Sequence, residues 1–258
     1  MSSFVVFLLL SFGLYQQSRQ ASAHSSPEEI ARILGNGDQE AVARVAEANE
    51  LVIPKEESNG AKANVPCQSF QSVRLRTVVL NEPGPQQVIE ARSDSCEYFY
   101  LVVLERSYKG EWKRIATLPI RFHARDVRIT YEALLGTREN QILVHGYTAG
   151  WGTGIWEYDF LVLRYVKGRF QVVLDVPEEV NLSEPEAKEP HGNTQQGQQS
   201  EFTIEDPKTD PDVVSHGTAT SKMIVEKQII TKHEVKVVRW RAYFWDEGLG
   251  FFSGMPWQ

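Results

Sequence analysis

The sequence predicts a mainly β protein of antiparallel meander units packed as a sandwich, preceded by a short αα-hairpin. Two observations carry this prediction. From residue 69 onward, apolar and polar side chains alternate with a period of two in successive short runs, and turn residues such as Lys109-Gly110 separate these runs. Before residue 54, by contrast, the apolar positions recur at helical spacing, and glycines at 35 and 37 interrupt them.

Composition and charge narrow the class of protein. The chain has 258 residues, of which 41% are hydrophobic and 24% charged, as in globular proteins that bury a sizeable core. Its net charge is −7. Because nucleic-acid affinity depends mainly on Lys and Arg neutralising phosphates, we expect no nucleic-acid partner. The same charge disfavours attraction to an anionic membrane surface.

Residues 1–23 are predicted to be a signal peptide. Positions 4–15 form an apolar run, and Ala21-Ser22-Ala23 follows as a small-x-small cleavage site, although no Lys or Arg precedes the run. The run is shorter than the about 20 residues that a membrane-spanning helix needs. We therefore expect an exported chain, periplasmic or extracellular, whose mature form is soluble and has no membrane span.

Residues 24–53 are predicted to form a helical hairpin. Ser26 and Pro27 are suited to begin one helix, and Asp38 is suited to cap the next. The apolar stripes of the two helices contain Ile30, Ile33, Leu34, Val42, Val45 and Ala46. Two short helices are marginal alone, so they must dock either on the chain's own β domain or on a partner. Residues 54–66 are polar and are predicted to be a linker.

Cys67 and Cys96 are the only cysteines in the chain. In an exported protein an even pair most simply forms one disulfide, and the alternative is two reduced, buried thiols. Their separation and the absence of neighbouring histidines do not resemble a zinc motif. The six histidines of the chain are scattered, so we expect neither a metal site nor a cofactor.

Residues 67–180 are predicted to be a β domain built from two similar units. The expected strands are 73–79, 86–92, 96–108, 111–118, 127–134, 141–147, 155–166 and 169–176, and Pro119 is expected to end the fourth. Positions that match 58 residues apart are Lys109, Gly110, Trp112, Ile115, Leu118 and Pro119 with Lys167, Gly168, Phe170, Val173, Val176 and Pro177. Glu97 and Tyr98 match Glu157 and Tyr158 at a spacing of 60. This internal repeat makes propeller-blade-like units the alternative architecture, although two or three blades cannot close a ring.

The remainder of the chain divides in two. Residues 181–212 are rich in Gln, Glu and Pro and are predicted to be a mobile loop, with a short strand at 202–204. Residues 213–258 are predicted to contain a C-terminal β hairpin, 222–230 with 234–245, that completes the β domain. Near its end Arg239, Trp240 and Arg241 interleave cations with an aromatic ring, which we interpret as an exposed strand face.

The most distinctive segment is 145–156, predicted to be a loop with four glycines. Its candidate binding residues are His145, Tyr147, Trp151 and Trp156. An exposed Trp151 on such a loop would stack on a sugar ring or a protein partner, whereas the alternative is that it packs over the β core. The glycine spacing does not fit a phosphate-binding loop.

No catalytic set can be assigned, and the function remains a hypothesis. We expect a non-catalytic exported binding module for a protein or carbohydrate. One alternative is a hydrolase assembled from several strands, with Glu157 and Asp159 about 6.5–7 Å apart on one strand face. The other is a structural component of an envelope assembly that docks through its N-terminal helices.

Overall fold

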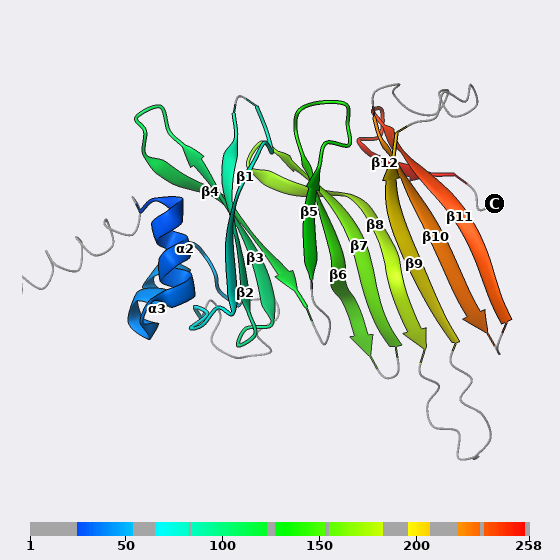
Figure 1. Ribbon diagram of the computed structural model, residues 1–258, viewed down its shortest axis with the longest axis horizontal. Coiled ribbons are helices and arrows are strands. Elements are labelled where there is room, and N and C mark those ends of the chain that lie inside the picture. Colours follow the sequence, from blue (N-terminus) through cyan, green and yellow to red (C-terminus); the bar gives the residue numbers. More distant parts are fainter. Residues whose placement is uncertain are drawn as a thin grey trace, which may run out of the picture. The chain divides into compact units, whose positions relative to one another are not determined.

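The structure is a computed structural model that describes residues 25–53, 65–82, 84–122, 127–152, 155–182, 196–206, 221–232 and 235–255 (Figure 1). It describes only the backbone of residues 148–152, 155, 156, 181, 182, 196 and 232. The described chain is mainly β, with one antiparallel sheet of four strands, another of eight, and two short helices. In each sheet the neighbouring strands follow one another in sequence, so both are meanders and the predicted fold class is confirmed.

The chain divides into two compact units. The first contains both helices and the four-stranded sheet, and the second contains the eight-stranded sheet. Residues 1–23 and most of the predicted linker lie outside the described residues, although Pro66 forms an isolated β-bridge with Val52. Among the described helices, neither is long and apolar enough to cross a membrane.

Both helices begin where the sequence predicts. Helix α2 (Pro27–Asn36) is capped by Ser26, whose hydroxyl accepts a hydrogen bond from the Glu29 N–H at 3.3 Å. Helix α3 (Gln39–Ala48) is capped by Asp38, whose carboxylate accepts from the Ala41 N–H at 2.8 Å. Each cap satisfies a donor that the first helical turn leaves unpaired.

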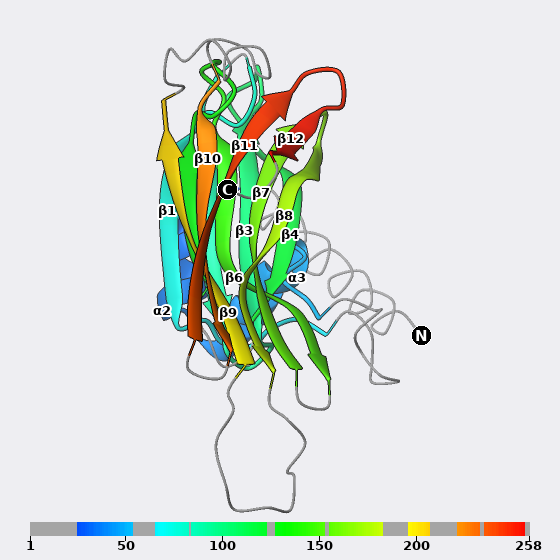
Figure 2. The ribbon, with the colours of Figure 1, turned by 90° about the vertical axis from the view of Figure 1, so that its right-hand side faces the viewer.

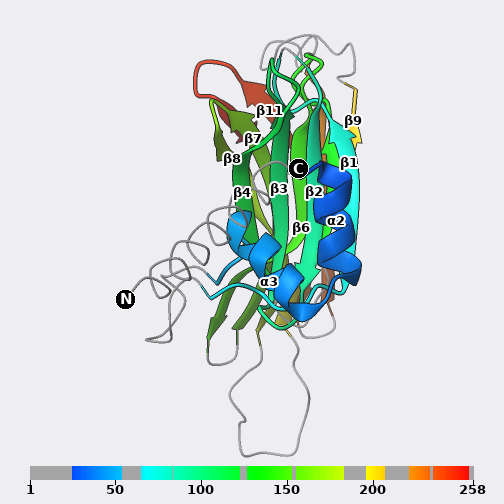
Figure 3. The ribbon, with the colours of Figure 1, turned by 90° about the vertical axis from the view of Figure 1, so that its left-hand side faces the viewer.

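The helices lie against the four-stranded sheet (Figure 3). This sheet contains β1 (Ser72–Val78), β2 (Gln86–Ser93), β3 (Tyr98–Arg106) and β4 (Trp112–Arg121), in that order. One buried cluster joins the two layers and includes Ile30, Leu34, Val42, Val45, Ala46, Ile89, Ala91, Tyr98, Tyr100, Val102 and Leu104. The apolar helix faces are therefore covered by the chain's own sheet, which was one of the two predicted possibilities.

The predicted disulfide between Cys67 and Cys96 is present, with the two Cα atoms 6.0 Å apart. The Cys67 N–H donates to the Leu51 carbonyl at 3.0 Å. The Tyr100 hydroxyl donates to the Val52 carbonyl at 3.1 Å and lies 3.1 Å from the Cys67 sulfur. Together these contacts attach the segment after the helices to the sheet.

Strand β4 is longer than predicted. Pro119 does not end the pairing: it lies opposite Tyr100, and the ladder continues to Arg121. A proline is tolerated here because β4 is the last strand of its sheet, so the missing N–H can face away from the ladder.

The second sheet contains β5 (Arg128–Glu132), β6 (Gln141–Gly152), β7 (Ile155–Val166), β8 (Arg169–Leu182), β9 (Gln196–Glu205), β10 (Met223–Lys232), β11 (Val235–Asp246) and β12 (Phe251–Gly254). The sheet curls, so that β12 reaches back to contact β8 (Figure 2). The curled face encloses a cluster that includes Leu134, Leu143, Phe160, Val162, Leu174, Ile224, Tyr243, Trp245 and Phe252.

Strand β9 corrects the prediction of a loop over 181–212. Residues Gln196–Glu205 are a ten-residue strand, paired with β10 along most of its length and with the end of β8. Polar composition misleads here because both neighbouring strands supply hydrogen bonds and only alternate side chains need to be apolar. Phe202 is one of these, and its ring stacks on Phe160 with 4.3 Å between centroids.

Candidate functional site

The predicted glycine-rich loop is a β hairpin. Strand β6 runs through it to Gly152, and β7 begins at Ile155, with Trp151 opposite Trp156. The strand predicted at 141–147 therefore continues to Gly152, so the prediction of a loop is wrong for residues 148–152, and residues 153–154 lie outside those described. The glycines do not end the strand pairing. The register between β6 and β7 shifts twice, and Gly146 in the first shift has a φ of 77°, a conformation that glycine adopts easily.

The structure brings Trp151 and Trp156 together as backbone neighbours, whereas their side chains lie outside the described residues. The β5–β6 ladder ends at Arg128 and His145. Beyond that pair, the described residues provide β6 with a partner on only one side, which is β7. Within the described part of the chain, the end of the hairpin is thus an edge of the sheet.

The base of this hairpin is fixed by Glu178, a residue that sequence reasoning did not single out. Its carboxylate accepts from the Gly146 N–H at 2.8 Å and lies 3.0 Å from His145 Nδ1. Glu178 occupies a register shift in β8, between the pairs Tyr158–Glu179 and Asp159–Pro177. The carboxylate therefore spans β7 and connects β6 to β8.

Aromatic packing completes the base. The His145 ring lies 4.6 Å from the Phe160 ring, which in turn stacks on Phe202. The side chains of His145 and Glu178 are only 12% and 10% exposed, so the pair is nearly shielded from water. Tyr147 lies opposite Asp159 in the β6–β7 ladder and is half-buried. Of the four candidate binding residues, His145 is part of the scaffold and Tyr147 is partly accessible.

Asp159 lies on the other face of β7. It is 6% exposed, and its Oδ1 atom has no hydrogen-bond partner among the described residues. Burial, followed by the charges of Asp175 and Glu157, raises the pKa of Asp159 to about 7. Burial disfavours the ionised carboxyl because it removes water, and neighbouring carboxylates add repulsion. Asp159 is therefore an acid that holds its proton at mildly acidic pH.

His145 and Asp159 lie on opposite faces of the sheet, and Glu178 interacts with both: it lies 3.0 Å from His145 Nδ1, and its charge is one of the causes that raise the pKa of Asp159. Successive residues of a strand point to opposite faces, so Asp159 and Phe160 face opposite ways. His145 packs on Phe160 and consequently lies on the face away from Asp159. Across the described residues, no three His, Cys, Asp or Glu side chains form a group that could hold a metal ion.

A second buried polar group was also missed from the sequence. Glu226 accepts from the Ser200 hydroxyl at 2.7 Å and from the Tyr243 hydroxyl at 2.6 Å. Burial and this hydrogen bond raise the pKa of Tyr243 above its ordinary value. Both carboxylate oxygens are used, so the group connects β9, β10 and β11 as a structural element. Ser200 could not be recognised because it falls in the predicted loop.

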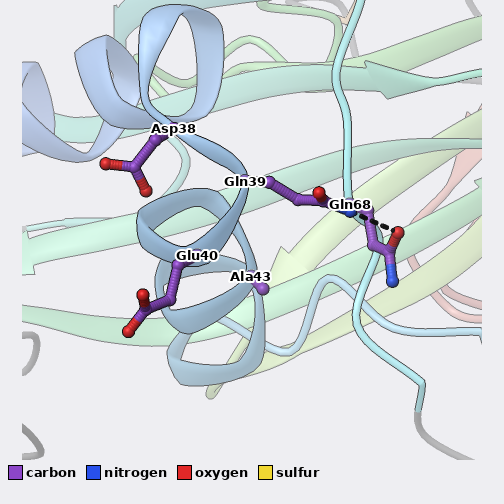
Figure 4. A pocket seen from close by; sticks show the side chains of 5 residues that line it. All are labelled: Asp38, Gln39, Glu40, Ala43 and Gln68. Atoms are coloured by element: carbon purple, nitrogen blue, oxygen red, sulfur yellow. Dashed lines mark hydrogen bonds between the residues drawn. The ribbon is translucent and has the colours of Figure 1, made fainter.

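An open pocket of about 510 Å³ lies in the first unit, beside the start of α3 (Figure 4). It is lined by Asp38, Gln39, Glu40, Ala43 and Gln68. Gln39 donates to Gln68 at 2.9 Å, while Asp38 is already used as a helix cap. This lining offers no nucleophile and no paired acid and base.

Comparison with protein-family models, with curated proteins and with solved structures finds no significant match. The function must therefore be argued from the geometry of the chain itself.

Proposed function

We propose that the protein is an exported, non-catalytic binding module whose protein or carbohydrate ligand contacts the β6–β7 hairpin. The observation that carries the proposal is the extension of β6 from His145 to Gly152, beyond the last pair with β5. Glu178 fixes the base of this extension through Gly146, so little ordering is required when a ligand binds. Trp151 and Tyr147 are the residues that we expect to contact the ligand.

The test compares two aromatic truncations, Trp151→Ala in the hairpin and Tyr108→Ala in the first unit, where Tyr108 is 94% exposed. An immobilised glycan array tests the carbohydrate arm, and a photo-crosslinking amino acid at position 148, which leaves Trp151 in place, tests the protein arm. Trp151→Ala should abolish binding with little change in Tm, and Tyr108→Ala should retain it. A large fall in Tm for Trp151→Ala would instead assign this side chain to the core.

Export is supported by the disulfide, because such bonds persist in oxidising compartments. The apolar run at 4–15 and the small residues at 21–23 add the sequence signal. N-terminal sequencing of protein from the producing cells should find a chain that begins near His24. An intact N-terminus together with two titratable thiols would contradict export.

A hydrolase is the second candidate, favoured by one observation: the pKa of Asp159 lies near 7, as a general acid requires. A panel of nitrophenyl esters and glycosides provides the test. Turnover by the native chain that Asp159→Asn removes would support catalysis. Turnover equal in both proteins, or none in either, would leave Asp159 without a catalytic role.

A further inference from the structure

The first half of β11 is an exposed and largely apolar strand. All six side chains from 235 to 240 are exposed. Four of them are large and apolar, with exposed fractions of 61% for Val235, 43% for Val237, 49% for Val238 and 48% for Trp240. Such a concentration of apolar side chains on one strand is unusual at a surface that meets only water.

This part of β11 is also an edge. On one side it pairs with β10 without a shift in register. On the other side, pairing with β12 covers only Tyr243 to Asp246, and the Met255 N–H donates to the Ala242 carbonyl at 2.9 Å. Along 235–240, the part of the chain that the structure describes supplies no strand on this outer side. Figure 1 shows β11 as the last long strand of the sheet, with β12 at one end only.

The backbone of this edge is oriented to accept another strand. Because the Ala242 carbonyl points to the outer side, and because the direction alternates along an antiparallel strand, Lys236, Val238 and Trp240 also present their N–H and C=O groups outward. A row of outward backbone groups is the template on which extended peptides add to a sheet.

The charge of this edge indicates the chemistry of the segment that it binds. Lys236 and Arg239 are exposed, and no acidic residue occurs between 235 and 245, although the whole chain carries a net charge of −7. Pairing with a second copy would place the four cations of two such edges, with no acidic residue between 235 and 245, on one short ladder, which like-charge repulsion disfavours. The Lys227 amine, which is paired with Glu201, lies 6.0 Å from the Trp240 ring.

We propose that the β11 edge binds an extended segment of another protein in which acidic and apolar side chains alternate. The segment adds to the sheet as a further strand, through the outward backbone groups of Lys236, Val238 and Trp240. Because successive side chains of a strand point to opposite faces, its acidic side chains lie on the face of Arg239, and its apolar side chains cover Val238 and Trp240 on the other face. This surface is separate from the β6–β7 hairpin and does not depend on the function proposed above.

The experiment uses the full chain and two capped peptides, one of alternating Glu and Val and the other of alternating Lys and Val. Calorimetric titration should show that the Glu–Val peptide binds at least about tenfold more tightly, with an affinity that falls as salt rises. The double variant Lys236→Glu/Arg239→Glu should reverse this preference, because it changes the sign of the edge and not its backbone.

The variant Val238→Pro separates backbone pairing from charge. The Val238 N–H points away from β10, so the proline removes an outward donor and leaves the β10–β11 hydrogen bonds in place. It should abolish binding while Tm is retained. Equal affinity for both peptides, no binding of either, or unchanged preference in the charge-reversed variant would overturn the proposal. Dimerisation without peptide that Val238→Pro abolishes would identify a second copy as the occupant and overturn it as well.

Discussion

The hairpins β3–β4 and β7–β8, one from each unit, share three features at equivalent positions. Gly110 and Gly168 occupy the turns with φ values of 84° and 83°. A one-residue register shift follows in each returning strand, at Ile115 and Val173. A proline then pairs across each ladder, Pro119 with Tyr100 and Pro177 with Asp159. All three features are 58 residues apart in the returning strands.

The register also corrects one predicted correspondence. Pairing aligns Tyr100 with Asp159, a spacing of 59, so Glu97 and Tyr98 do not match Glu157 and Tyr158. The spacing differs by one residue because the two turns differ in length. In the β3–β4 turn the Ser107 N–H donates to the Glu111 carbonyl, which encloses three residues. In the β7–β8 turn the pair Val166 and Arg169 encloses two. Origin by duplication stays a prediction.

The difference between the hairpins lies beyond the shared prolines. In the first, the pairing stays regular to Arg121, and Tyr100 is a fully buried aromatic residue of the core. In the second, the equivalent position is the buried acid Asp159, and one additional residue, Glu178, shifts the register and binds Gly146. Two hairpins of similar backbone geometry thus differ in their side chains: one contributes an aromatic residue to the core, and the other carries ionisable groups. The departures gather beside the proposed ligand-binding hairpin.

The largest test of this comparison is Tyr100→Ala. The side chain is 0% exposed and its hydroxyl is hydrogen-bonded, so truncation should lower the unfolding free energy by about 3–5 kcal/mol. Denaturant titration measures the change. Tyr108→Ala, at an exposed position of the same hairpin, is the control and should stay within about 0.5 kcal/mol of the native chain. Similar losses of stability in both variants would contradict the assignment of Tyr100 to the core.

The next test is Asp159→Asn, read as a function of pH. The native pKa of about 7 lies above the ordinary value of 3.8, so the folded state binds the proton more tightly than the unfolded state does. Stability should therefore fall as pH rises from about 4 to 7 and level off above that. Asn removes this dependence, and the variant should be more stable than the native chain by about 1–3 kcal/mol at pH 8.

Thermal melts between pH 4 and 8 measure this difference. Asp175→Asn is the matched variant, because it removes one charge that raises the pKa of Asp159 and leaves the acid in place. It should reduce the pH dependence without abolishing it. A pH dependence that survives unchanged in Asp159→Asn would show that another group titrates in this window.

The smallest effect is expected at the shared turns. Gly110→Ala and Gly168→Ala should each cost about 1 kcal/mol, since both positions have a positive φ and neither added Cβ meets an atom closer than 3.6 Å. Gly84→Ala is the control, because nothing lies within 4 Å of its added Cβ. Chemical denaturation should show equal losses at the two turns. Unequal losses would mean that the different lengths of the two turns, and not the shared positive φ, determine the cost.

Local signals were predicted well. Ser26 and Asp38 cap their helices, and the alternation of apolar residues identified most strands, because these features depend on neighbours a few residues away. The extent of β9 and of the β6–β7 hairpin was not predictable. Polar or glycine-rich segments become strands when flanking strands supply the hydrogen bonds, and those strands come from distant parts of the chain.

The sequence by itself therefore determined the fold class, the helical hairpin and the disulfide pair, because composition, period and cysteine count are local or countable properties. Only the tertiary structure decided which side chains meet. Glu178 reaches Gly146 over the intervening strand, and Asp159 becomes a weak acid through burial beside Asp175. The edge of β11 likewise depends on where β12 stops pairing. Each of these depends on register and burial, which are fixed only when the whole sheet has formed.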